Sequence, residues 1–138
     1  MGTFDFSRLG VLLVEDNSYI RQTPEDLLRN FRFVRIATAK DGEEAIDYMK
    51  TLGSAGSIIA PDIIISDLVM SPINGLLFLR WTRTAKESLS RMAPFIMLSG
   101  AADEAYVHSA RDLGATEFLA KPFSATSVYG HLLKVIEQ

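Results

Sequence analysis

Five short apolar segments recur along the chain, and each one leads into polar or charged residues. Segments of this length and composition are typical of buried β-strands, and we expect strands at residues 11–14, 33–37, 63–67, 95–98 and 117–120. After each strand, apolar residues recur at helical spacing, which indicates amphipathic helices. These helices should begin near residues 18, 41, 75, 102 and 124. The chain therefore alternates strands with helices.

This alternation predicts an α/β fold in which a parallel sheet carries helices on both faces, because strand–helix–strand crossovers are right-handed. The first, third and fourth strands are apolar up to their ends, whereas the second and fifth carry charged residues. The apolar strands should therefore occupy the centre of the sheet and the charged strands its edges. The doubly wound, flavodoxin-like strand order 2-1-3-4-5 meets this requirement, with its switch point between strands one and three.

Proline and glycine refine the helix boundaries. Pro24 interrupts the first helical pattern, to which Ile20, Leu27 and Phe31 belong, and we expect a kink or a restart near Thr23. Gly114 is suited to end the fourth helix in the left-handed conformation. The second helix should have an inner stripe of Ala45, Met49 and Leu52, and the third should contain Leu76, Leu77, Leu79 and a packed Trp81. The last helix should bury Val128, Leu132 and either Val135 or Ile136.

Three carboxylates follow two strands that should be neighbours in the sheet. Glu15 and Asp16 come directly after the first strand, and Asp67 ends the third. Because parallel strands bring their carboxyl ends to one edge, the three acids should meet in the crevice at the switch point. Their mutual repulsion favours a bound divalent cation, and Mg²⁺ suits carboxylate oxygens best. The alternatives are that Asp67 only forms a turn, or that the site binds metal without phosphate chemistry.

A hydroxyl and an ammonium group follow the other two strands of interest. Ser99 ends the fourth strand and Lys121 follows the fifth. Together with Mg²⁺, these groups would stabilise a phosphoryl group carried by Asp67, and a carboxylate is an established phosphoryl nucleophile. Taken separately, Lys121 would be interpreted as a solvated lysine and Ser99 as a helix-capping hydroxyl.

The combination resembles the receiver domains of two-component response regulators, of which the single-domain chemotaxis regulator is the simplest type. The resemblance extends from about residue 10 to residue 137. It is carried by Glu15 and Asp16, by Asp67 with Gly75 eight residues later, by Ser99, and by Lys121, Pro122 and Phe123.

The resemblance implies a role for each of these residues. Asp67 would be the phosphoacceptor, Asp16 and Asp67 would ligate Mg²⁺ directly, Glu15 would act through water, and Val69 would contribute its carbonyl. Ser99 would be the switch hydroxyl and Lys121 the phosphoryl-binding lysine, with a cis bond before Pro122 that directs the ammonium group into the site.

The chain also departs from the pattern of the family. The aromatic switch position on the fifth strand is Phe118, which has no hydroxyl group, so its rotamer exchange would act through packing. Ser71 separates Met70 from Pro72, where the family usually has proline directly after methionine. Val69 and Ala101 place apolar groups near positions that tune dephosphorylation, and we expect a changed lifetime of the phosphoryl group.

The resemblance further implies partners. A histidine kinase or a histidine phosphotransfer protein would supply the phosphoryl group, and a downstream protein would bind the face made by the fourth helix, the fifth strand and the fifth helix. A phosphorylation-dependent homodimer is an open alternative. The chain is interpreted as a signalling domain that assists its own phosphoryl transfer and dephosphorylation, not as an enzyme. His108 and His131 are interpreted as surface residues.

Composition excludes several other classes of protein. The 138 residues include 14 basic and 17 acidic side chains, a net charge of -3, and no cysteine. Without a basic cluster, nucleic-acid binding by this chain alone is not expected, and disulfide or thiolate sites are excluded. No apolar run could cross a bilayer, and we expect a cytoplasmic protein with one receiver domain over residues 1–138, of which residues 1–9 form a short lead.

Three alternatives remain. The chain could be the receiver part of a longer regulator. An aspartyl-phosphate hydrolase of the haloacid dehalogenase type would need a second aspartate two residues after Asp67, where Val69 stands. A flavodoxin-like cofactor binder would need a glycine- and hydroxyl-rich loop after the first strand, where Glu15 and Asp16 would repel a phosphate.

Overall fold

A computed structural model describes residues 6–16, 25–54, 60–68, 74–99, 104–120 and 125–136. Its strands are β1 (Gly10–Val14), β2 (Arg35–Ala39), β3 (Ile63–Asp67), β4 (Phe95–Ser99) and β5 (Glu117–Ala120). Its helices are α2 (Gly42–Ser54), α3 (Gly75–Thr84), α4 (Glu104–Asp112) and α5 (Ala125–Ile136), and residues 25–30 are also helical. No helix among the described residues combines the length and apolar character that a bilayer crossing requires.

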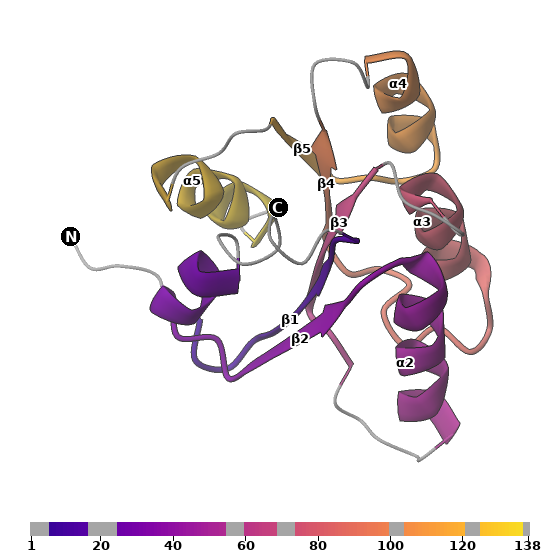
Figure 1. Cartoon of the computed structure of the whole chain (residues 1–138), viewed down its shortest axis with the longest axis horizontal. Helices are drawn as coiled ribbons and strands as arrows, with labels where there is room; N and C mark the ends of the chain where they lie inside the picture. The colour runs from indigo at the N-terminus through magenta and orange to yellow at the C-terminus, as the bar shows by residue number, and fades with distance from the viewer. Residues whose placement is uncertain are drawn as a thin grey trace.

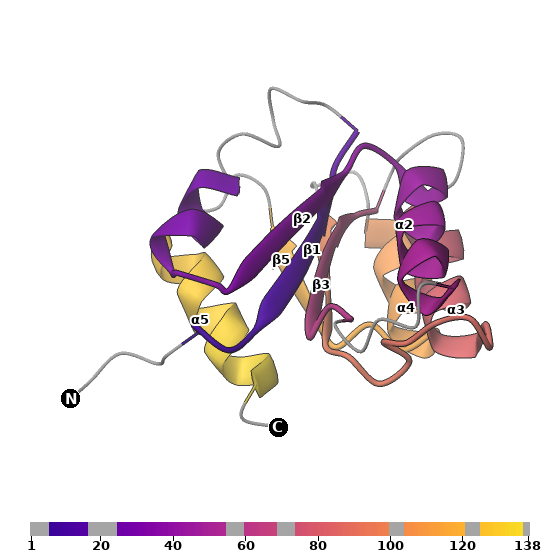
Figure 2. The ribbon, with the colours of Figure 1, turned by 90° about the horizontal axis from the view of Figure 1, so that it is seen from below.

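The five strands form one parallel sheet in the order β2-β1-β3-β4-β5. Figures 1 and 2 show α2, α3 and α4 on one face of the sheet, and α5 with the helical segment at residues 25–30 on the other. The predicted fold class and strand order are therefore confirmed. The apolar strands β1, β3 and β4 lie inside the sheet because both of their faces are covered, and the more polar β2 and β5 lie at its edges.

Successive strand residues contribute to two separate cores. In β1, Leu12 and Val14 pack towards α2, α3 and α4, whereas Val11 and Leu13 pack towards the helices of the opposite face. This alternation follows from the two-residue period of a strand. Phe6, which precedes β1, is also buried in the second core.

The second strand begins two residues later than the sequence predicted. Its ladder with β1 starts at the pair Gly10 and Arg35, so the expected start at Phe33 was wrong. Phe33 instead packs against Phe6, with ring centroids 4.8 Å apart, and Val34 is exposed. Phe33 is therefore apolar because it belongs to an aromatic cluster with Phe6 and not because it extends the strand.

The helix predictions were correct in most positions. Val128 and Leu132 are buried as expected, and Gly114 has a positive φ of 104° after α4. In α3, however, Leu77 is 52% exposed and Phe78 is fully buried, because the helix turns Phe78, Leu79 and Thr82 towards the sheet.

The helix after β1 was predicted less completely. Leu28, which the predicted apolar stripe omitted, is its most buried described residue. The expected kink or restart near Thr23 lies outside the described residues.

Candidate functional site

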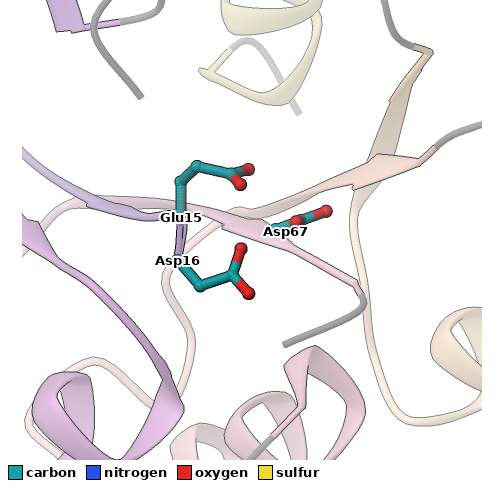
Figure 3. Close-up of side chains that lie close together, drawn as sticks. All are labelled: Glu15, Asp16 and Asp67. Atoms are coloured by element: carbon teal, nitrogen blue, oxygen red, sulfur yellow. The ribbon is translucent and has the colours of Figure 1, made fainter. Parts of the chain in front are cut away.

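The carboxyl ends of β1 and β3 lie side by side, because these strands are hydrogen-bonded neighbours with Val14 opposite Ser66. The chain leaves β1 at Glu15 and Asp16, and Asp67 is the last residue of β3. Figure 3 shows these three carboxylates gathered at this edge of the sheet. The predicted convergence of the three acids is therefore confirmed.

The three acids are close enough to share one cation. One carboxylate oxygen from each of Glu15, Asp16 and Asp67 lies within 4.8 Å of the other two. Glu15 is only 1% exposed and Asp67 5% exposed, whereas Asp16 faces solvent. Like charges at this separation repel one another strongly where water is partly excluded. The cluster is thus a region of high negative potential in which two of the three carboxylates are buried.

The donor set fits a small divalent cation. Mg²⁺ binds oxygen ligands at about 2.0–2.1 Å in octahedral geometry, so its ligand oxygens stand roughly 3 Å apart, or about 4 Å apart when opposite. One oxygen from each of Glu15, Asp16 and Asp67 lies within 4.8 Å of the others, slightly beyond this span, so a shared cation requires a small inward movement of the side chains or a bridging water at one of them. With one acid solvent-facing and two buried, water molecules can complete the shell on the open side. The residues present therefore fit Mg²⁺.

Backbone and hydroxyl groups hold Asp67 from both sides. The backbone N–H of Leu68 donates a hydrogen bond of 2.9 Å to Oδ1 of Asp67. The hydroxyl of Ser66 donates one of 3.0 Å to the carbonyl of Asp67. Both groups are buried, so these bonds are protected from exchange with water. The bond from Leu68 limits the rotation of the Asp67 carboxylate, and the bond from Ser66 fixes the backbone carbonyl of Asp67.

Gly75, at the start of α3, lies directly against the backbone of Asp67. A Cβ atom at Gly75 would overlap the carbonyl oxygen of Asp67 and stand 2.9 Å from Cα of Leu68. The glycine N–H also donates a hydrogen bond of 2.9 Å to the carbonyl of Leu68. Only glycine permits this approach, because the clashing atoms belong to backbone and cannot rotate away. The sequence shows that Gly75 follows Asp67 by eight residues, but it does not show that a side chain at this position would clash with the backbone of Asp67.

The other predicted site residues are described only in part. Ser99 is the last residue of β4 and pairs with Ala120 of β5, but its side chain is not among those described. Val69, Lys121 and Pro122 lie outside the described residues. The structure therefore brings together Glu15, Asp16 and Asp67, and the positions of the remaining predicted groups stay predictions.

The predicted switch residue, Phe118, is partly buried on β5 and packs against the core under α2, α3 and α4. The guanidinium carbon of Arg111, on α4, lies 5.0 Å from the centroid of its ring. Sequence reasoning did not identify Arg111, because nothing in its local pattern distinguishes it from any other basic residue in the last turn of a helix.

Known proteins resemble the chain in sequence and in structure. It is 33% identical over 117 residues to a probable chemotaxis protein CheY of Rhizobium etli, an alignment that covers 85% of this chain and 84% of the relative. It is 29% identical over 118 residues to the transcriptional regulatory protein PdtaR of Mycobacterium tuberculosis, of which it covers 52%. The chain thus spans about half the length of this second relative.

Among solved structures, the receiver domain of a sensor histidine kinase from Pseudomonas aeruginosa superposes with a TM-score of 0.78. The two chains are 26% identical, and the match covers 95% of this chain and 99% of the other. That structure has a magnesium ion coordinated in its active-site cleft. One of the structures that this chain resembles is therefore a receiver domain with a magnesium ion in its active-site cleft.

The match to a known sequence family covers most of the chain. Residues 11–132 match the response regulator receiver domain. This range contains all five strands from Val11 onward and the three clustered acids. The chain therefore belongs to the family of response regulator receiver domains.

Proposed function

We propose that this receiver domain is a phosphorylation-controlled signalling switch in which Asp67 accepts a phosphoryl group from a phosphohistidine protein. The observation that carries the proposal is the cluster of Glu15, Asp16 and Asp67 at the switch point, in a chain of the receiver family. A histidine kinase or a histidine phosphotransfer protein would be the phosphoryl donor.

The proposed transfer forms one bond and breaks another. An oxygen of the Asp67 carboxylate attacks phosphorus, and the P–N bond of phosphohistidine breaks. The ring keeps the proton on its other nitrogen and leaves as neutral imidazole. Asp16 and Asp67 would hold Mg²⁺ directly and Glu15 through water. Of the three acids, Asp16 faces solvent, and Glu15 and Asp67 are buried. When bound, Mg²⁺ neutralises phosphoryl oxygens and the charge of the acids. Leu68 and Gly75 keep Asp67 in place at the end of β3.

The remaining site residues are proposed from the family pattern. Lys121 would bind a phosphoryl oxygen, aided by a cis bond before Pro122, and Ser99 would donate a hydrogen bond to another. Val69 would give its carbonyl to the metal. These assignments are supported by the position of Ser99 at the end of β4, which pairs with the strand that carries Asp67, and by the position of β5, directly before Lys121 and paired with β4.

Output would occur through the face formed by α4, β5 and α5. Phosphorylation would repack Phe118 and so alter the surface that a downstream protein recognises. Tyr106 on α4 is 49% exposed, which supports a protein-binding role for this face. We propose that residues 1–138 act as one receiver domain; in a second candidate, supported by the 52% coverage of PdtaR, they form the receiver part of a longer regulator.

The proposal is tested by incubating the chain with acetyl phosphate or phosphoramidate and Mg²⁺ and measuring the intact mass. We expect a labile phosphate adduct in the wild-type chain, none in Asp67→Asn, and a normal adduct in Asp47→Asn, which changes an exposed carboxylate on α2. The absence of an adduct on the wild-type chain, with correct folding shown by circular dichroism, would contradict the proposed function.

A further inference from the structure

Ser66 is the one polar residue of β3 before Asp67, and it follows three isoleucines. It is fully buried and pairs with Val14 of β1 and with Met97 of β4, both of which are buried and apolar. Branched apolar side chains suit such a position better, and a buried hydroxyl weakens the fold unless it is hydrogen-bonded. A departure from the local pattern in the centre of a sheet is expected at functional positions. The reason for a serine at this position must therefore lie in the contacts of its hydroxyl.

The Ser66 hydroxyl holds the peptide group that joins Asp67 to Leu68. It donates a hydrogen bond of 3.0 Å to the carbonyl oxygen of Asp67. At the other end of this peptide group, the N–H of Leu68 is shared between the carbonyl of Leu98 on β4, at 3.1 Å, and Oδ1 of Asp67, at 2.9 Å. The oxygen and the N–H of one peptide group are thus both fixed, and the N–H bonds directly to the Asp67 carboxylate.

The fixed carbonyl also lies against helix α3. Ser66 shares the face of β3 that carries Ile64, which packs towards α2, α3 and α4, because side chains alternate along a strand. A Cβ atom at Gly75, the first residue of α3, would overlap the carbonyl oxygen of Asp67. This oxygen therefore meets both the Ser66 hydroxyl and the start of α3, and both contacts restrict the rotation of its peptide group.

We propose that Ser66 is a positioning residue for phosphoryl transfer: its hydroxyl keeps the Leu68 N–H directed at Oδ1 of Asp67 and so orients the carboxylate that attacks phosphorus. This role rests on the proposed function. Because the carbonyl and the N–H belong to one rigid plane, a rotation that frees the carbonyl from Ser66 also turns the N–H away from Oδ1. A nucleophile that is already held in its reactive geometry reacts faster, since less ordering remains when the donor arrives. A hydroxyl with a structural role alone would add stability without affecting this orientation.

The first test compares rates of phosphorylation, followed by intact mass after phosphoramidate and Mg²⁺ are added. Ser66→Ala should be phosphorylated about two- to ten-fold more slowly than the wild type, which is the equivalent of one hydrogen bond. Ser66→Cys fills the same space but donates only weakly, so it should also be slower. A folded Ser66→Ala with the wild-type rate would overturn the proposal. If that variant does not fold, the wild-type rate in Ser66→Cys would overturn it instead.

Ser90→Ala is the matched control, because it removes the same kind of bond at the other end of the same strand. Ser90 is 4% exposed, and its hydroxyl donates a hydrogen bond of 2.7 Å to the carbonyl of Pro61, which precedes β3. Ser90→Ala should be less stable than the wild type in urea but keep the wild-type rate of phosphorylation. An equal fall in rate in Ser66→Ala and Ser90→Ala would show that lost stability alone slows the reaction, and would overturn the positioning role.

The orientation itself is measured by NMR, on the protein without metal or phosphate. An amide proton that is bonded to a carboxylate resonates at low field, because that bond is short and strong. The Leu68 amide proton should move upfield in Ser66→Ala, by more than the amide proton of Ile65, and should stay in place in Ser90→Ala. A Leu68 shift no larger than that of Ile65 would overturn the proposal.

These two tests separate the positioning role of Ser66 from the proposed function. A wild-type chain that takes up no phosphoryl group would contradict the proposed function, while the Leu68 resonance would still decide whether Ser66 orients the carboxylate. A wild-type chain that is phosphorylated on Asp67, at a rate that Ser66→Ala matches, would overturn the positioning role alone.

Discussion

Gly75 is the single residue whose replacement should disturb the Asp67 site most directly. The methyl group of Gly75→Ala would meet the carbonyl oxygen of Asp67 and Cα of Leu68, at 2.9 Å from the latter. Both are backbone atoms, so α3 or the end of β3 must move. We expect a loss of about 1–3 kcal/mol in the free energy of unfolding, measured in urea, together with slower phosphorylation.

Gly130 provides the matched control for this substitution. It lies within α5, and a Cβ atom there would meet nothing within 4 Å. Because alanine favours helix more than glycine does, Gly130→Ala should stabilise the protein by up to about 1 kcal/mol. If Gly75→Ala were as stable as the wild type and were phosphorylated at the same rate, the close packing of α3 on Asp67 would have no functional role.

At the scale of secondary-structure elements, an ion pair connects β5 to α5. Nζ of Lys134 lies 3.0 Å from Oε2 of Glu117, and the backbone N–H of Phe118 donates a hydrogen bond to Oε1. Partial burial by itself would raise the pKa of the Glu117 carboxyl. The hydrogen bonds from Lys134 and Phe118, with the charges of Lys134 and His131, outweigh burial and hold this pKa below its usual value.

A lowered pKa in the folded state means that the ionised carboxyl stabilises the fold. The stabilisation is complete above the unfolded-state pKa of about 4.3 and disappears as the pH falls through the lower folded-state value. Lys134→Met should therefore lose up to about 1 kcal/mol at neutral pH and show a weaker fall in stability on acidification than the wild type. Lys50→Met, on α2, is the control. Parallel pH profiles for Lys134→Met and the wild type would contradict this expectation.

Arg83 links three segments at the end of the sheet that lies opposite Asp67. From α3 it donates hydrogen bonds to the carbonyls of Arg91, Ala93 and Gly114, at 2.7 to 3.2 Å. Its guanidinium also lies over the ring of Phe95, 6.0 Å from the centroid. Burial lowers the pKa of this guanidinium. The Arg83 side chain thus connects α3 both to the segment before β4 and to the turn after α4.

A lysine cannot reproduce this set of bonds, because it lacks the planar fork of donors. We expect Arg83→Lys to lower the free energy of unfolding by about 2 kcal/mol or more, measured in urea. The same change at Arg80, which is exposed on α3, should have little effect. Equal stabilities for the two variants would mean that the carbonyls bonded to Arg83 are satisfied equally well without it.

At the scale of the whole molecule, the sequence predicted those features that depend on periodic patterns. Strand order followed from which segments were apolar on both faces, and the meeting of Asp16 with Asp67 followed from the order of the strands. The start of β2 was predicted wrongly, because an apolar residue such as Phe33 suits a strand and an aromatic cluster equally well.

The features that could not be predicted depend on contacts between distant residues. No local pattern distinguishes Arg111 or Arg83 from other helical arginines, since their partners lie on other elements. The need for glycine at Gly75 likewise arises only when α3 meets the end of β3. These positions therefore become apparent from the packed structure alone.

We propose that Asp67 is the residue that receives the phosphoryl group, in a site completed by Mg²⁺. The most direct measurement is reductive trapping of the acyl phosphate with borohydride, followed by peptide mass analysis of the chain treated with acetyl phosphate. We expect modification at Asp67 alone, present with Mg²⁺ and lost when the metal is chelated. Modification of a different carboxylate, or modification of Asp67 that is unchanged by chelation, would contradict the account.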